Sequence, residues 1–233
     1  MPLEMQIGTN MAVHLQHLLG QAIVSGAYDD KPFPTEVDLA TELGASRTVV
    51  REAIKMLTAK GLISARQRGA RVLPMSAWDL LDPDVTHWLA ARPFSLDVYR
   101  EFTHMRLAVE PVAAALAAQR PDRTIIAEIG SQLDNIRSAP AATEARLQAT
   151  IDFHTAILVA SGNAFFHRLQ GLIHTTLHMA APIAGVSDNT DLSMREEIYE
   201  AIVNRDSTNA EATMRALLLK SRQSLEEIGS AGP

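Results

Sequence analysis

Residues 33–72 read FPTEVDLATELGASRTVVREAIKMLTAKGLISARQRGARV and contain the signals for two short helices. The second helix is predicted over Arg47–Lys60, because Ser46 is a preferred N-cap and Gly61 a preferred stop. The first helix is predicted over Val37–Leu43, and only a short turn separates it from the second. Two short helices joined by so short a turn are typical of a helix-turn-helix unit.

Further elements flank this helix pair. Apolar residues at three- and four-residue spacing predict an amphipathic helix over Asn10–Gly26. After Gly61, extended segments at residues 62–65 and 70–73 flank a turn at Gln67–Gly69, which predicts a β-hairpin. The N-terminal part is therefore predicted as three helices followed by a two-stranded ribbon.

Charge is distributed unevenly along the 233-residue chain, whose formal net charge is −6. Residues 1–75 sum to +1, whereas residues 76–233 sum to −7. Between Gly44 and Leu73, seven Lys or Arg residues stand against a single acid, Glu52. Such a basic stretch in an acidic protein is a candidate nucleic-acid footprint, although a solvated helix face without a partner would have the same charge.

The Arg47–Lys60 helix has the side chains that a recognition helix needs. Arg47 and Arg51 lie one turn apart on one face, and an arginine can donate two hydrogen bonds to guanine O6 and N7. The hairpin turn would lie against the DNA backbone or the minor groove, where Gly69 permits close approach. The residues expected to contact DNA are Ser46, Arg47, Thr48, Arg51, Lys55, Arg66, Arg68 and Gly69.

These residues resemble the N-terminal winged helix of GntR-type bacterial transcription regulators over residues 33–72. The family pattern is kept in register at Pro34, Glu36, Leu39-Ala40, Gly44, Ser46-Arg47, Val50 to Ala53, Leu57, Gly61-Leu62, Gly69 and Val72. The resemblance implies operator contacts from Arg47, Thr48 and Arg51, with Arg68 and Gly69 at the wing. One position departs from the family: Val37 replaces an arginine that touches DNA in relatives, and Lys31 or Arg66 is the candidate substitute.

The remainder of the chain reads as helical, with helices predicted over residues 84–91, 96–119, 123–138, 143–161, 164–180, 192–205 and 208–228. Short connections predict an antiparallel helix bundle, so the fold class is mainly α. The expected domains are a winged helix-turn-helix domain at 1–75, a linker and connecting helix at 76–95, and an all-helical ligand-binding and dimerisation domain at 96–233.

The helical part resembles the FCD effector domain of the FadR-like subgroup. The supporting motifs are Arg106 to Pro111, Leu116-Ala117-Ala118, Phe153-His154, Ala160 to Asn163, and Ala201 to Asp206 with Ala210 and Met214. The segment WDLLDPDVTHWL at residues 78–89 is similar to that of regulators of sugar-acid genes, including galactonate regulators. The resemblance implies a pocket for a small carboxylate effector.

In many FCD domains, one Asp and three His residues hold a divalent metal at the base of the pocket. By this resemblance His154 keeps one ligand position, while the other three hold Thr150, Arg195 and Leu217. Because one ligand of four cannot hold a metal, we expect a metal-free pocket and no cofactor. Arg195 is then the candidate for the positive charge that a metal would supply, and Arg106 is a second candidate pocket arginine.

Other interpretations of these side chains stay open. A solvated Arg195, or an Arg106 paired to Glu110, would take no part in ligand binding. His174 and His178 lie four residues apart on one helix and either line the cavity, pack in the core, or form an ectopic metal site with His154. The residues expected to bind the ligand are Arg106, His154, His174, His178 and Arg195.

Several function classes are excluded or disfavoured. The chain has no cysteine, which excludes disulfide scaffolds, zinc knuckles, iron–sulfur sites and thiol nucleophiles. It lacks a P-loop, a dinucleotide fingerprint and a Gly-x-Ser-x-Gly motif, which disfavours an enzyme such as a metal-dependent hydrolase in the helical part. No stretch is apolar enough to span a membrane and we expect no secretion signal, which favours the cytoplasm.

The leading prediction is a ligand-responsive transcription regulator, a repressor that a small organic acid such as a sugar acid releases from DNA. It is expected to bind a pseudo-palindromic double-stranded operator as a homodimer, because one short helix reads too few base pairs. The alternatives are metal-dependent effector sensing at the histidine cluster, a helical-domain enzyme, and an interaction module whose winged helix binds protein. The basic stretch argues against the last of these.

Overall fold

The chain folds into two compact units that divide between Arg92 and Pro93. The computed structural model describes residues 3–66, 69–120, 122–183 and 189–230. Within these ranges, no helix is both long enough and apolar enough to cross a lipid bilayer.

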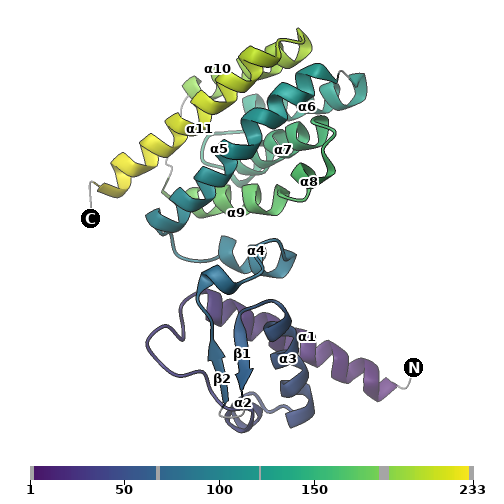
Figure 1. The fold of residues 1–233 in the computed structure, drawn as a ribbon, viewed down its shortest axis with the longest axis vertical. Helices are drawn as coiled ribbons and strands as arrows, with labels where there is room; N and C mark the ends of the chain where they lie inside the picture. The colour runs from purple at the N-terminus through teal and green to yellow at the C-terminus, as the bar shows by residue number, and fades with distance from the viewer. Residues whose placement is uncertain (1–2, 67–68, 121, 184–188, 231–233) are drawn as a thin grey trace. The chain divides into compact units, whose positions relative to one another are not determined.

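The N-terminal unit has the predicted order of three helices and a ribbon. It begins with α1 (Leu3–Val24), α2 (Glu36–Glu42) and α3 (Arg47–Ala59), followed by β1 (Ile63–Arg66) and β2 (Gly69–Val72) (Figure 1). The two strands pair antiparallel, and the side chains buried between helices and ribbon include Leu15, Leu19, Ile23, Leu39, Val50, Ile54, Leu57 and Leu62. The predicted start of the first helix was wrong: α1 begins at Leu3 rather than at Asn10, because Leu3 to Gln6 are good helix formers and no proline lies between them and Asn10.

The segment after the ribbon packs onto this unit. It forms the 3₁₀ turn η1 (Met75–Ala77) and α4 (Pro83–Ala90). The indole Nε1 of Trp78 donates to the carbonyl of Leu73 at 2.8 Å, and Lys60 Nζ lies 2.6 Å from Asp82 Oδ2. Most of the segment predicted as linker and connecting helix (76–95) is therefore fastened to the winged helix, and the unit extends to residue 92 rather than ending at 75.

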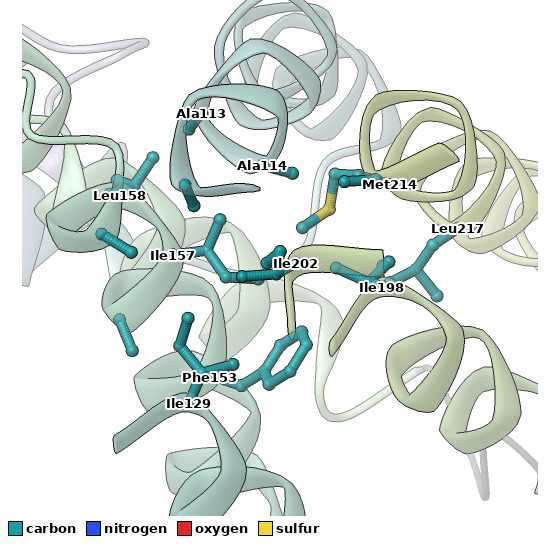
Figure 2. Packing of buried hydrophobic residues seen from close by; sticks show 14 of the residues in the cluster. Ala113, Ala114, Ile129, Phe153, Ile157, Leu158, Ile198, Ile202, Met214 and Leu217 are labelled. Atoms are coloured by element: carbon teal, nitrogen blue, oxygen red, sulfur yellow. The ribbon is translucent and has the colours of Figure 1, made fainter. Parts of the chain in front are cut away.

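The C-terminal unit is all helical, as predicted. Its helices are α5 (Leu96–Gln119), α6 (Arg123–Ser138), α7 (Glu144–Ala160), α8 (Ala164–His167), α9 (Gln170–Ala180), α10 (Asn189–Val203) and α11 (Ser207–Ser230). Helix α5 packs along α11 and against α7, while α6 packs against α7 and α10 (Figure 1). Figure 2 shows the shared core, in which Phe153 and Ile157 from α7 face Ile202 from α10, and Met214 comes in from α11.

The single helix predicted over 164–180 is divided in the structure. Asn163 caps α8 by accepting from the backbone N–H of Phe165 at 3.0 Å. The backbone then tightens, because Arg168 and Leu169 each donate to the carbonyl three residues earlier. This turn separates α8 from α9 although no proline marks it.

The contact between α1 and α4 generates a stability prediction. A Cβ atom added to Gly20 would lie 2.4 Å from the ring of Trp88, which is buried. We expect Gly20→Ala to lower the free energy of unfolding by about 1–3 kcal/mol through overpacking, although alanine favours a helix interior. Urea denaturation followed by tryptophan fluorescence measures the change. The exposed neighbour Gln21→Ala is the matched control, and a Gly20→Ala protein as stable as that control would contradict the packing.

Candidate DNA-binding face and ligand cavity

Helix α3 begins at Arg47, directly after its N-cap residue Ser46. Ser46 has extended backbone angles, and its hydroxyl accepts from the backbone N–H of Val49 at 3.3 Å. The preceding α2 begins with a complete capping box between Thr35 and Asp38. Gly44 joins the two helices with a φ of +61°, which favours glycine. The buried residues of α3, Val50, Ala53, Ile54 and Leu57, then leave the opposite face to solvent.

That solvent face is basic. Arg47, Arg51 and Lys55 are exposed and follow each other at four-residue spacing, so they form one stripe along α3. Arg51 pairs with Glu36 of α2 at 3.1 Å, and Lys55 pairs with Glu52 at 2.8 Å. Exposed ion pairs of this kind are weak, so phosphates can replace the carboxylates. In the described part of the chain Arg47 makes no ion pair, and its guanidinium is available at the N-terminal end of the helix.

The remaining predicted DNA contacts fall into two groups. Thr48 is exposed beside Arg47, and the hydroxyl of Ser46 still has a proton to donate after its oxygen caps the helix. The residue Arg68 and the side chain of Arg66 lie outside the described residues. Gly69 opens β2 opposite Arg66 in the register of the ribbon, so the wing contacts stay predictions.

The position where relatives have an arginine is open to solvent. Val37 lies on α2 and is 47% exposed. Of its two candidate substitutes, Lys31 holds its Nζ 5.2 Å from the ring centroid of Tyr28. Lys31 therefore has a partner within its own loop.

A cavity of about 240 Å³ lies within the C-terminal unit. This space equals roughly eight water volumes, which suits a small organic molecule. Its lining includes three arginines, Arg106, Arg146 and Arg195, and two carboxylates, Glu144 and Asp191. Its hydroxyl-bearing residues are Tyr99, Thr143, Thr150, Ser221 and Ser224.

One wall of the cavity contains a buried charge cluster. Arg106 pairs with Glu110 one turn further along α5, and Glu110 Oε2 lies 2.5 Å from His154 Nδ1 on α7. Burial is the largest single effect and would raise the pKa of Glu110, but Arg106 and His154 together outweigh burial and hold this pKa at about 2. Burial lowers the pKa of His154, so its neutral ring donates from Nδ1 to Glu110. Arg106 therefore lines the cavity and is also paired to Glu110, and its role in ligand binding stays a prediction.

Arg195 also lines the cavity and is only 9% exposed. Its Nη1 donates to the carbonyl of Asp191 at 2.9 Å, while its Nε has no hydrogen-bond partner among the described residues. Burial lowers the pKa of Arg195 to about 10; Asp191 opposes this effect, and Arg106 and Arg146 add to it. The carboxylate of Asp191 is itself shared with Lys220 at 3.3 Å. Arg195 is thus charged at neutral pH and incompletely compensated.

The residues of this region do not fit a divalent metal. Across the residues that the structure describes, no group of three or more His, Asp or Glu side chains is placed to hold one. Leu217, at one of the positions where the resemblance expects a ligand, lies buried in the hydrophobic core (Figure 2). Arg195 fills another such position with a cation, which would repel a metal ion.

The structure brings some of the predicted ligand-binding residues together and separates others. Arg106 and Arg195 line the cavity, whereas His154 pairs with Glu110 and is not among the lining residues. His174 and His178 stack on each other along α9, with ring centroids 4.1 Å apart, and are not among the lining residues. The predictions missed Arg146, although Arg146, Thr150 and His154 follow each other at four-residue spacing, and this pattern indicates one shared helix face.

Comparison with protein families agrees with this architecture. Residues 11–72 match the bacterial regulatory proteins of the gntR family, and residues 101–220 match the FCD domain. The uncharacterized HTH-type transcriptional regulator YieP of Escherichia coli is 32% identical over 218 residues, which cover 90% of this chain and 93% of the relative. The galactonate operon transcriptional repressor of E. coli is 30% identical over 216 residues, covering 90% and 94%.

Solved structures share the fold. The Listeria monocytogenes protein Lar, described as controlling expression of the agr system, superposes with a TM-score of 0.62 at 17% identity, over 93% of this chain and 96% of its own. A GntR transcriptional regulator from Rhodococcus sp. RHA1 gives a TM-score of 0.53 at 18% identity, over 93% and 97%. At these identities the likeness concerns the fold alone.

The buried cluster generates a pH prediction for Glu110→Gln. The pKa of Glu110 lies below its ordinary value of 4.5 in the folded state, so its stabilising effect is present above pH 4.5 and is lost as the pH falls toward 2. We expect Glu110→Gln to cost about 3 kcal/mol of unfolding free energy near pH 7, because Arg106 loses its buried partner. The difference from wild type should shrink by about pH 3, as urea denaturation at the two pH values would measure.

The control for this prediction is Glu211→Gln, which breaks an exposed pair with Arg215. Its cost should stay below about 1 kcal/mol at both pH values. Parallel pH profiles for wild type and Glu110→Gln would show that Glu110 is not the ionised partner of Arg106.

Proposed function

Because the chain belongs to the GntR family of bacterial regulatory proteins and has an FCD domain, we propose that it is a repressor that a small organic acid releases from a DNA operator. The relatives described above are named as transcription regulators, and the chain is a DNA-binding transcription regulator rather than an enzyme. The name of the E. coli galactonate operon transcriptional repressor supports repression as the direction of control.

The observation that carries DNA binding is the exposed basic stripe on α3. Arg47, Arg51 and Lys55 share one face, and the opposite face is buried against the unit's core. A helix of this kind enters the major groove and reads base edges with its N-terminal residues. Arg47 is the strongest candidate for base contact, since it lies at the first position of the helix.

We propose that two copies bind together. One recognition helix of this length contacts only a few base pairs, and a homodimer on a pseudo-palindromic operator doubles the number read. Such a regulator acts where the chromosome lies, which agrees with the cytoplasmic location expected from the sequence.

The cavity in the C-terminal unit is the proposed effector site. Its three arginines outnumber its two carboxylates, which favours an anionic ligand, and its volume suits a small molecule. The name of the E. coli galactonate operon repressor supports a sugar acid, and other small carboxylates match the same charge. Ligand binding then changes operator affinity as a coupling between two sites.

The coupling passes along the segment that connects the two units, and this segment begins at residues 74–83. In the structure it is fastened to the winged helix, since the backbone of Asp79 donates to the carbonyl of Lys60 and the Lys60 side chain pairs with Asp82. We therefore assign the transmitting step to the boundary between Arg92 and Pro93.

The DNA-binding proposal predicts a loss of affinity in Arg47→Ala and Arg51→Ala. Each variant should bind an operator duplex, selected by the full-length protein from a random-sequence pool, about tenfold or more weakly than wild type. Fluorescence anisotropy over a range of salt concentrations measures both affinity and the number of phosphate contacts. Arg215→Ala, an exposed arginine of the C-terminal unit, is the matched control and should bind normally. If the double charge reversal of Arg47 and Arg51 to Glu leaves occupancy intact, α3 is not the reading helix.

The effector proposal predicts release of the same duplex. Titration of the wild-type complex with a panel of small carboxylates should identify one that lowers operator affinity by about five- to 150-fold, the usual range of coupling between two sites. A compound that binds the protein without changing operator affinity would refute the switch and leave DNA binding standing.

A further inference from the structure

Arg195 is a buried cation whose charge the described residues compensate only in part. The guanidinium is more than nine-tenths buried, and its Nε has no partner among the described residues. The carboxylate of Asp191, whose charge acts on Arg195, also pairs with Lys220. A buried, incompletely paired charge costs free energy, because the protein does not replace the water that solvated it. Since Arg195 lines the cavity, a bound anion can supply the missing partner.

The hydroxyl groups of the cavity indicate a second property of the ligand. Thr150 donates its hydroxyl proton to the carbonyl of Arg146 at 2.8 Å, and Ser221 donates to Leu217 at 3.0 Å. Each hydroxyl oxygen then has lone pairs left to accept a hydrogen bond. Because their hydroxyl protons are already donated to the backbone, Thr150 and Ser221 can accept a hydrogen bond from an O–H group of a ligand but cannot donate one to it.

The surrounding charges also decide how the anion is held. Arg106 is already engaged by Glu110, and Arg146 donates to the carbonyls of Ile136 and Ala139 at 3.0 and 3.2 Å. Arg195 is thus the cavity arginine with a free N–H at a buried position. A metal between this guanidinium and the anion would have to approach a like charge without enough carboxylate or imidazole donors.

We infer that the cavity binds a hydroxylated carboxylate whose carboxylate group is held directly by the guanidinium of Arg195, with no metal ion between them. The inference rests on the proposed function, in which this cavity is the effector site. Arginine presents two N–H groups in a plane that matches a carboxylate, so the pair is charge-assisted and directional. Thr150 and Ser221 then accept from the hydroxyl groups of the ligand.

Thermal unfolding of the full-length protein without DNA, in buffer with EDTA, tests this inference. The probes are the hydroxylated acids galactonate, gluconate and mannonate, with sorbitol as the polyol that lacks a carboxylate and hexanoate as the acid that lacks hydroxyls. We expect at least one hydroxylated acid to raise the Tm of wild type by mass action in the presence of EDTA. Hexanoate should raise it less, and sorbitol should leave it unchanged.

Two variants locate the contact. Arg195→Met should weaken binding of that acid on the order of 100-fold, since it removes a buried charged partner. The free Arg195→Met protein should unfold at or above the Tm of wild type, because an uncompensated buried charge is gone. Thr150→Val should weaken binding of the hydroxylated acid and leave hexanoate binding as it was. Arg215→Met, which removes an exposed arginine that is not among the lining residues, should change none of these values.

Each opposite result overturns the inference. It fails if none of the three hydroxylated acids raises the Tm, if sorbitol is equally effective, or if EDTA abolishes the effect and a divalent metal restores it. It also fails if Arg195→Met binds the acid as tightly as wild type, or if its free form is strongly destabilised and Thr150→Val has no effect. Because these measurements contain no DNA, they are separate from the operator assays, whose failure would refute the proposed function instead.

Discussion

A charged side chain that is buried on folding needs a partner of opposite charge. This constraint determines how the buried charged residues of the C-terminal unit are arranged. At the α5–α7 contact it is met, since Arg106, Glu110 and His154 form one closed cluster in which each group has its complement. At Arg195 it is met only in part, because Asp191 and Glu110 act on its charge while its Nε has no hydrogen-bond partner among the described residues. Arg106 of this cluster and Arg195 both line the cavity, and the incompletely compensated charge of Arg195 is the basis for the proposed anionic ligand.

Much of the N-terminal unit could be predicted from local sequence because its boundaries depend on local chemistry. The cap at Ser46 and the stop at Gly61 bracket α3 in the sequence and in the structure. Local signals failed where tertiary contacts decide: the division of 164–180 into α8 and α9 has no proline to mark it. The docking of residues 75–90 depends on partners such as Lys60 that are distant in sequence.

The cavity was less predictable for the same reason. Arg106 and Arg195 could be selected because the resemblance to FCD domains indicates the helix positions that face the pocket. The absence of a partner for the Arg195 Nε depends on where Asp191 and Lys220 lie, which only the folded chain shows. His174 and His178 have the spacing of a ligand pair, but this spacing predicts only that they share a helix face and does not say what the face meets.

Because residues 75–90 are attached to the winged helix, recombination between genes of this family can exchange the DNA-binding unit intact only at certain positions. Asp82 and Asp84 neutralise Lys60, and the ring of Trp88 lies against Gly20 with no room for a larger residue. A crossover after codon 75 would join the winged helix to a foreign helix in place of α4, whose side chains complement it. The DNA-binding unit that can be exchanged between genes therefore ends near codon 92. A different effector domain joined there would leave the contacts between α4 and the winged helix intact.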